Sequence, residues 1–318
     1  MNDILYIVIP CYNEEKVLPI THKMFLNELN TLIEKGKINS NSKILFVDDG
    51  SNDSTWGIIT SLSHQYEFIE GIQQSKNRGH QNAVLLGMIE SMDKCDICVT
   101  IDCDGQDDIT AIEQMIDKYQ EGYDVVYGVR DNRDTDTFFK RFTAQGFYTL
   151  LKKMGVDVIY NHADYRLMSK AALNGFSQFK EVNLFLRGMV PLVGFKHTCV
   201  YYKRNERLAG ESHYPLKKML ALAIDGITSL SITPLRIITF LGIMVSCLSF
   251  FFVIWVIIGY FSGKTVLGWA SIISLICLFC GIQLISVGII GEYIGKIYME
   301  VKRRPRYIVS GRTTNRNE

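Results

Sequence analysis

Carboxylates gather at the end of one apolar run in this chain. Ile97–Ile101 is apolar enough to form a buried strand, and Asp102, Asp104 and Asp107 follow it. Because side chains alternate along an extended chain, Asp102 and Asp104 are expected on the same side. Carboxylate oxygens are hard ligands that suit Mg²⁺ or Mn²⁺. The segment is a candidate site for a divalent metal that bridges a nucleoside diphosphate to the protein, and an acidic polar turn is the simpler alternative.

Two earlier strand ends carry groups that suit a nucleotide. Ile4–Ile9 is predicted to be a short buried strand, and Tyr12, just beyond it, can pack on a planar base. Lys43–Val47 is a second predicted strand that ends in adjacent carboxylates at Asp48 and Asp49. Two carboxylates exceed what capping of the next helix requires, so Asp49 is a candidate acceptor for a uracil N–H or a ribose hydroxyl.

The helices that position these strand ends have recognisable starts. Asn13 is expected to cap a helix that runs to about Lys35. Phe68–Gln73 is a third predicted strand, and the segment Asn77-Arg78-Gly79 leads into a helix from about Asn82 to Met92. A basic, glycine-containing lead-in to a helix N-terminus suits a phosphate or a ribose.

Strands and helices keep alternating, with a predicted helix over Ile109–Gln120 and a strand over Asp124–Gly128. This order predicts an α/β fold with a doubly wound, parallel-type sheet, whose ligand crevice lies beyond the carboxyl ends of the strands. Arg130 follows the Asp124–Gly128 strand directly and can bind an anion there, unless it is simply a surface arginine. Phe195–Tyr202 is expected to be the strand that completes the sheet.

Two polar segments follow that could belong to the same crevice. Asp164 and Arg166 stand two residues apart, which fits either an exposed salt bridge of little energetic value or a carboxylate at the edge of the site. Lys203–Tyr214 is a polar loop that contains Arg207 and Ser212.

The last third of the chain has the character of a membrane segment. Apolar residues recur at helical spacing from Pro215, which predicts an amphipathic helix on a membrane surface. Ile237–Gly263 and Thr265–Gly291 carry no charge, and each is long enough to cross a hydrocarbon core of about 30 Å. Lys264 alone separates them, so we expect a transmembrane hairpin. Basic residues flank it: Lys217, Lys218, Arg236, Lys296, Lys302, Arg303, Arg304 and Arg306.

The positive-inside rule then places both ends of the hairpin, and with them the globular part and both termini, in the cytoplasm. The expected organisation is a catalytic domain over 1–213, juxtamembrane helices over 214–235, two transmembrane helices over 236–292 and a basic tail over 293–318. The chain of 318 residues has a net charge of only +1, which argues against a nucleic-acid-binding protein.

Several motifs occur in an order that resembles glycosyltransferase family 2, with its GT-A (Rossmann-like) fold. They are Ile9-Pro10-Cys11-Tyr12-Asn13-Glu14-Glu15, Val47-Asp48-Asp49-Gly50-Ser51, Asn77-Arg78-Gly79, Asp102-Cys103-Asp104-Gly105-Gln106, Asp164-Tyr165-Arg166-Leu167-Met168 and Arg207-Leu208-Ala209-Gly210-Glu211-Ser212. Together with the hairpin, they resemble the polyprenyl-phosphate glycosyltransferases, relatives of dolichyl-phosphate mannose synthase and the bactoprenol glucosyltransferases. The family usually has Leu at the position of Gly105 and Lys at that of His213, so this chain departs from the pattern at both.

The resemblance implies a role for each group of site residues. The nucleoside part would be held by Pro10, Tyr12, Glu14, Asp49 and Asn77, with Asp102 nearby on the nucleotide. Asp104 and Gln106 would ligate a divalent metal, Mg²⁺ or Mn²⁺. The acceptor phosphate would be held by Arg130, Arg207 and Ser212. Asp164 is the position proposed as a base in such enzymes.

The expected reaction is transfer of a sugar from a nucleoside diphosphate sugar to undecaprenyl phosphate, with inversion, by a membrane-bound homo-oligomer. Glucose from UDP-glucose is the first choice, and N-acetylhexosamine or mannose donors are the alternatives. A phosphate monoester is largely a dianion at neutral pH, because its second pKa is about 6. It needs no general base, so we expect Asp164, paired with Arg166, to position rather than to accept a proton.

Two other functions would require different sequence features. A processive polysaccharide synthase of the same fold would carry a Gln-x-x-Arg-Trp motif, and no arginine here precedes a tryptophan. A non-catalytic membrane partner that binds a nucleotide sugar or accompanies a flippase would not need the set of Asp102, Asp104 and Gln106.

Overall fold

The apolar runs of the first two hundred residues form most of one mixed sheet in a computed structural model, which describes residues 2–131, 162–204, 227–229, 231–262 and 268–313. The sheet has 8 strands in the order β7-β5-β6-β4-β1-β2-β3-β8. The strands are β1 (Leu5–Cys11), β2 (Lys43–Asp48), β3 (Ile69–Gln74), β4 (Ile97–Thr100), β5 (Val125–Arg130), β6 (His162–Ser169), β7 (His197–Tyr202) and β8 (Val309–Arg312).

Helices cover both faces of this sheet, which confirms the predicted α/β class. Residues Leu5, Ile7 and Ile9 of β1 pack in one apolar core, and Tyr6 and Val8 pack in the other. Both faces are therefore buried, as in doubly wound folds. The helices are α1 (Leu18–Glu34), α2 (Thr55–Gln65), α3 (His80–Ser91), α4 (Ala111–Gln120), α6 (Lys170–Ser177), α7 (Leu186–Met189), the 3₁₀ helix η1 (Val190–Val193), α9 (Thr233–Phe261) and α10 (Trp269–Val301).

Strand β6 is the main departure from the predicted parallel arrangement. It lies between β4 and β5 and is antiparallel to both, whereas β1, β2, β3 and β4 run parallel. Its sequence does not resemble a central strand, because it carries Asp164 and Arg166. Residues two apart in a strand lie on the same face, so these opposite charges can neutralise each other inside the sheet.

The start of α1 also differs from the prediction. The N-cap residue is Val17, not Asn13, and Pro19 stands in the first turn, where its missing N–H costs nothing. Asn13 has a positive φ of 55°, and its side-chain oxygen accepts a hydrogen bond from the Asn52 backbone N–H at 2.9 Å. The Asn13 side chain therefore joins the loops after β1 and β2 instead of capping a helix.

Strand β8 corrects the expectation that the sheet is complete at Tyr202 and that residues 293–318 are a tail. Val309–Arg312 pairs antiparallel with β3 and forms the edge of the sheet. Arg312 also forms a salt bridge with Glu90 of α3 at 2.8 Å. The chain thus returns to the sheet after its apolar helices.

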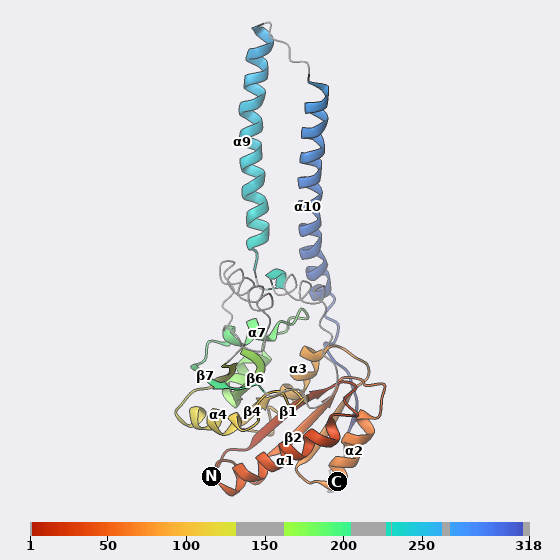
Figure 1. Ribbon diagram of the computed structural model, residues 1–318, viewed down its shortest axis with the longest axis vertical. Coiled ribbons are helices and arrows are strands. Elements are labelled where there is room, and N and C mark those ends of the chain that lie inside the picture. Colours follow the sequence, from red (N-terminus) through yellow and green to blue (C-terminus); the bar gives the residue numbers. More distant parts are fainter. Residues whose placement is uncertain (1, 132–161, 205–226, 230, 263–267, 314–318) are drawn as a thin grey trace.

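Helices α9 and α10 extend side by side away from the sheet domain (Figure 1). Both are long and apolar enough to cross a membrane, over Thr233–Phe252 and Leu278–Val301. Large apolar side chains stay exposed along them, including Phe250, Phe251 and Leu284 at 65%, 68% and 73%. Such a surface is unfavourable in water and suits lipid. The predicted amphipathic helix from Pro215 falls largely outside the described residues.

Two helical glycines allow a matched test of the packing between α3 and the sheet. A Cβ on Gly87 would lie 2.2 Å from Cγ1 of Val8 and 3.0 Å from Cγ2 of Val47, whereas a Cβ on Gly57 in α2 would meet nothing within 4 Å. We expect Gly87→Ala to destabilise the protein by about 1–3 kcal/mol through overpacking. Gly57→Ala should be neutral or stabilising by up to about 1 kcal/mol, because alanine is the better helix former. Thermal unfolding of the full chain in detergent measures both, and equal shifts would contradict this packing.

Candidate functional site

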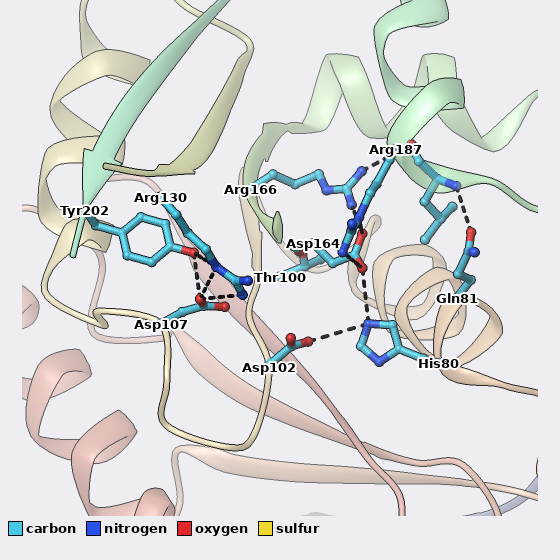
Figure 2. Close-up of polar contacts among 11 residues, drawn as sticks. His80, Gln81, Thr100, Asp102, Asp107, Arg130, Asp164, Arg166, Arg187 and Tyr202 are labelled. Carbon is cyan, nitrogen blue, oxygen red and sulfur yellow. Dashed lines mark hydrogen bonds and ion pairs between the residues drawn. The ribbon is translucent and has the colours of Figure 1, made fainter. Parts of the chain in front are cut away.

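The candidate site lies where the carboxyl ends of the parallel strands meet the first residues of β6. β6 runs antiparallel, so its N-terminal residues reach the edge at which β4 ends. Thr100, the last residue of β4, donates a hydrogen bond from its hydroxyl to the Asp164 carbonyl oxygen at 2.6 Å. This contact places Asp164 beside Asp102, and Figure 2 shows both carboxylates directed toward His80.

Asp164 is held by two guanidinium groups. Arg166 donates from Nη2 to one carboxylate oxygen at 2.7 Å, and Arg187 donates from Nη2 to the other at 3.1 Å. Arg166 is fully buried, so the alternative of an exposed salt bridge is wrong. Burial opposes ionisation, but the charges of Arg187 and Arg166 and the hydrogen bond to His80 hold the pKa of Asp164 well below its usual range. A carboxylate in this state is a poor proton acceptor.

His80 bridges Asp164 and Asp102. Its Nε2 lies 3.6 Å from one Asp164 oxygen and 3.5 Å from one Asp102 oxygen. Desolvation lowers the pKa of His80, but the hydrogen bond to Asp164 and the charge of Asp102 outweigh it and raise the pKa to about 9. His80 is therefore a cation at neutral pH, at the first residue of α3.

A second cluster contains Arg130, one of the residues expected to hold a phosphate. Its Nη2 lies 3.0 Å from Asp107, and the Tyr202 hydroxyl donates to the same Asp107 oxygen at 2.6 Å. Asp107 is only 3% exposed, so Arg130 neutralises a buried charge. Figure 2 shows this cluster on the other side of Asp102 from Arg187. Arg130 belongs to β5 rather than following it, because that strand runs two residues further than predicted.

The segment expected to hold a metal forms a turn after β4. One Asp104 carboxylate oxygen accepts a hydrogen bond from the Gln106 backbone N–H at 3.0 Å, and the Gln106 side-chain oxygen accepts one from Arg204. Burial and the neighbouring carboxylates raise the pKa of Asp102 to about 6, although the His80 charge opposes this.

Within the described residues, no three Asp, Glu, His or Cys side chains are grouped so that they enclose a metal ion. Mg²⁺, however, is commonly held by one or two carboxylates together with substrate phosphates and water. The hard oxygens of Asp104 and Gln106 fit that kind of binding.

Asp49 supports the loop after β3. Its carboxylate accepts hydrogen bonds from the backbone N–H groups of Arg78 and Gly79 at 2.8 and 2.9 Å, and from the Gln74 side chain at 3.1 Å. It is 2% exposed, so most of its hydrogen-bonding capacity is used inside the protein. Gly50, with φ of 66°, lies against this loop, since a Cβ there would be 2.5 Å from the Lys76 carbonyl carbon.

The other residues expected around the nucleoside lie on the same edge. Pro10 is buried within β1, and Tyr12, just after that strand, is 42% exposed. The Glu14 backbone N–H donates to Thr55 at 2.8 Å, and the Asn77 side chain accepts from Gly79 at 3.1 Å. Arg207 and Ser212 lie outside the described residues.

His80 and Arg187 are the site residues that sequence reasoning missed. His80 follows the basic lead-in to α3, which did indicate an anion site, but Arg187 belongs to no recognisable motif. Both line a cavity of about 410 Å³. The rest of its wall comes from three parts of the chain: Arg78, Gly79, Gln81 and Asn82, then Asp164, then Val182, Leu184 and Phe185.

The comparisons with known proteins agree with the resemblance. A family model described as glycosyl transferase family 2 matches residues 6–176. An uncharacterised glycosyltransferase, YkoT of Bacillus subtilis, is 49% identical over 96% of this chain and 91% of its own. The bactoprenol glucosyl transferase of Shigella phage SfX is 37% identical, over 96% and 98% of the two chains.

Solved structures are more distant. The mannosyltransferase PcManGT of Pyrobaculum calidifontis, in complex with GDP-Man and Mn²⁺, has a TM-score of 0.46 at 13% identity, covering 72% of this chain and 62% of that chain. The family model alone spans more than half of the 318 residues. The chain belongs to glycosyltransferase family 2.

Proposed function

We propose that this chain transfers a sugar from a nucleoside diphosphate sugar to undecaprenyl phosphate at the cytoplasmic face of the membrane, with inversion at the anomeric carbon. The donor we propose is UDP-glucose. The observation that carries the proposal is that a family 2 catalytic domain continues, in the same chain, into two helices with exposed apolar surfaces. A relative that covers nearly the whole chain is named a bactoprenol glucosyl transferase, which supports the same acceptor and sugar.

The donor is proposed to lie along the ends of β1, β2 and β4. Tyr12 would pack on the base, while Pro10, Glu14 and Asn77 line the nucleoside part with Asp102 near the diphosphate. Asp49 would act largely through the loop that it supports, because three of its hydrogen bonds are made within the protein.

Asp104 and Gln106 would hold a divalent metal against the diphosphate. When bound, the ion would supply Lewis-acid stabilisation of the negative charge that develops on the leaving group. For Gln106 to ligate the metal, its side-chain oxygen would have to give up its hydrogen bond from Arg204 and bind the ion instead.

The acceptor phosphate is proposed to enter the cavity lined by Arg78, His80 and Arg187. Arg187 is 36% exposed and His80 is a cation, so together they favour a dianion. Arg130, Arg207 and Ser212 remain proposed contacts from the family resemblance, although Arg130 is already paired with Asp107.

The chemistry then needs no protein nucleophile and no protein base. A phosphate oxygen attacks the anomeric carbon, and the bond from that carbon to the diphosphate oxygen breaks on the opposite face, which inverts the configuration. Asp164 is ionised and bound by Arg166 and Arg187, so it is unsuited to forming a covalent sugar intermediate. Its role is to position Arg187.

The hairpin is proposed to span the membrane with both ends in the cytoplasm, because basic residues flank it on that side. A lipid-anchored phosphate has to be met at the bilayer surface, and the hairpin keeps the catalytic domain there.

The proposal is tested with purified full-length protein in detergent, undecaprenyl phosphate, Mg²⁺ or Mn²⁺, and a panel of UDP-glucose, UDP-N-acetylglucosamine and GDP-mannose. We expect glycosylated lipid and UDP from UDP-glucose at the highest kcat/KM. A higher kcat/KM with another donor would show that this donor, and not UDP-glucose, is the substrate. Release of nucleotide without glycosylated lipid would contradict undecaprenyl phosphate as the acceptor.

Asp104→Ala is expected to lower kcat by at least about a hundredfold, because it removes a hard ligand that stabilises the leaving diphosphate. Asp93→Ala, an exposed carboxylate beyond α3, is the matched control and should keep wild-type activity. Both variants should unfold at the wild-type temperature. Turnover of Asp104→Ala at the wild-type rate with either metal would contradict the metal assignment.

Arg187→Ala is expected to raise the KM for undecaprenyl phosphate about tenfold or more, while the KM for the donor changes less than about twofold, because a charge-assisted contact is worth about 1.5–3 kcal/mol. Steady-state kinetics with each substrate varied in turn separates the two constants.

Arg130→Ala gives the matched comparison. It leaves Asp107 buried without its guanidinium, so the expected main effect is a loss of stability on the order of 3 kcal/mol, seen as a lower melting temperature. A larger rise in acceptor KM for Arg130→Ala than for Arg187→Ala would place the phosphate at Arg130 instead.

A further inference from the structure

The last turn of α10 holds a loop of the catalytic domain through one carboxylate. Glu300 accepts hydrogen bonds from the Val182 backbone N–H at 2.8 and 3.0 Å, and from the backbone and side-chain N–H groups of Asn183 at 2.9 and 2.8 Å. The Asn183 side chain also donates to the Lys296 carbonyl oxygen at 3.3 Å. These contacts join residues more than a hundred positions apart in the chain.

The loop held by Glu300 leads directly to the acceptor cavity. Leu184 and Phe185 line that cavity, and the Leu186 backbone N–H donates to the Gln81 side chain at 2.8 Å. Next along the chain, Nη2 of Arg187 lies 3.1 Å from a carboxylate oxygen of Asp164. Residues 182–187 are thus tied to α10 at one end and to the candidate active site at the other.

The contact between α10 and this loop lies beside an open space. A cavity of about 850 Å³ borders the contact, with a wall formed by Phe179, Val182, Glu300 and the basic residues after α10. On its far side, Arg306 donates to the Phe179 carbonyl oxygen at 3.0 Å. The hydrogen bonds to Glu300 cross directly from α10 to the loop beside this cavity, and bonds to a charged acceptor are the stronger kind.

We propose that Glu300 is a positioning residue that sets the place of Arg187 from the end of the membrane helix. By fixing Val182 and Asn183, it limits where the chain can put Arg187 four residues later, and so couples the hairpin to the acceptor cavity. Its kinetic consequence rests on the function proposed above, but the structural part does not.

The structural part is tested by hydrogen–deuterium exchange of the full-length protein in detergent. In Glu300→Ala, the amides of residues 182–187 should exchange at least about tenfold faster, because their local opening costs less free energy. Glu292→Ala, an exposed glutamate of the same helix, is the matched control and should leave this segment unchanged. Equal protection in wild type and Glu300→Ala would overturn the proposal, whether or not the protein transfers a sugar.

The kinetic part is tested by a double-mutant cycle with Arg187→Ala. Glu300→Ala alone should raise the acceptor KM about five- to tenfold and leave the donor KM within about twofold. In the Arg187→Ala background, it should raise the acceptor KM by less than about a further twofold. If Glu300→Ala weakened the fold in general, the rises in acceptor KM of the two single variants would multiply in the double variant, or the KM values of both donor and acceptor would change. Either result would contradict a role of Glu300 through Arg187.

Glu300→Gln serves if the alanine variant does not fold. It keeps one acceptor oxygen but turns a donor N–H group toward the Val182 and Asn183 N–H groups, so an intermediate effect on exchange and on acceptor KM is expected. An effect on donor KM alone would contradict the proposal. Wild-type protein that shows no transfer to the lipid, yet shows the exchange difference, would refute the proposed function and leave the positioning role intact.

Discussion

The site depends on one ionised carboxylate that is shielded from water and bound by two arginines. A buried charge is tolerated only when it is paired and hydrogen-bonded, and removal of a partner is costly. Asp164 therefore requires Arg166 within the sheet and Arg187 from the short helix α7. These requirements explain a strand with charged residues in the middle of a sheet. They also explain why a short helix without any motif is held against that strand.

Much of the fold could be predicted from the sequence, because apolar periodicity reports which side chains must leave water. The alternation of strands and helices indicated the α/β class and, up to β5, most of the predicted boundaries to within two residues. The uncharged runs before and after Lys264 predicted the paired helices. Strands β6 and β8 could not be predicted this way. The charged residues Asp164 and Arg166 interrupt the apolar pattern of β6, and β8 is a short, partly exposed edge strand. Their pairing depends on partners far away in the sequence.

The candidate site likewise has one part that the sequence predicts and one part that it does not. Residues at strand ends, such as Asp49, Asp102 and Asp104, are recognisable because topology brings the ends of parallel strands to one edge. What each contacts is not recognisable: Asp49 is used mostly to hold a loop, and Arg130 to neutralise a buried aspartate. Arg187 shows the larger difficulty, since its importance comes only from a contact with Asp164 across the fold.

Strand β8 has a consequence for how the protein is made. Synthesis runs from the N-terminus, so the edge of β3 stays unpaired until the ribosome has completed α9 and α10 and then Val309–Arg312. An open strand edge is a template for pairing with other chains. Closure of the sheet comes after both apolar helices have left the ribosome. Delivery to the bilayer and completion of the catalytic domain are therefore steps of one assembly sequence, and a delay in the first prolongs the exposure of that edge.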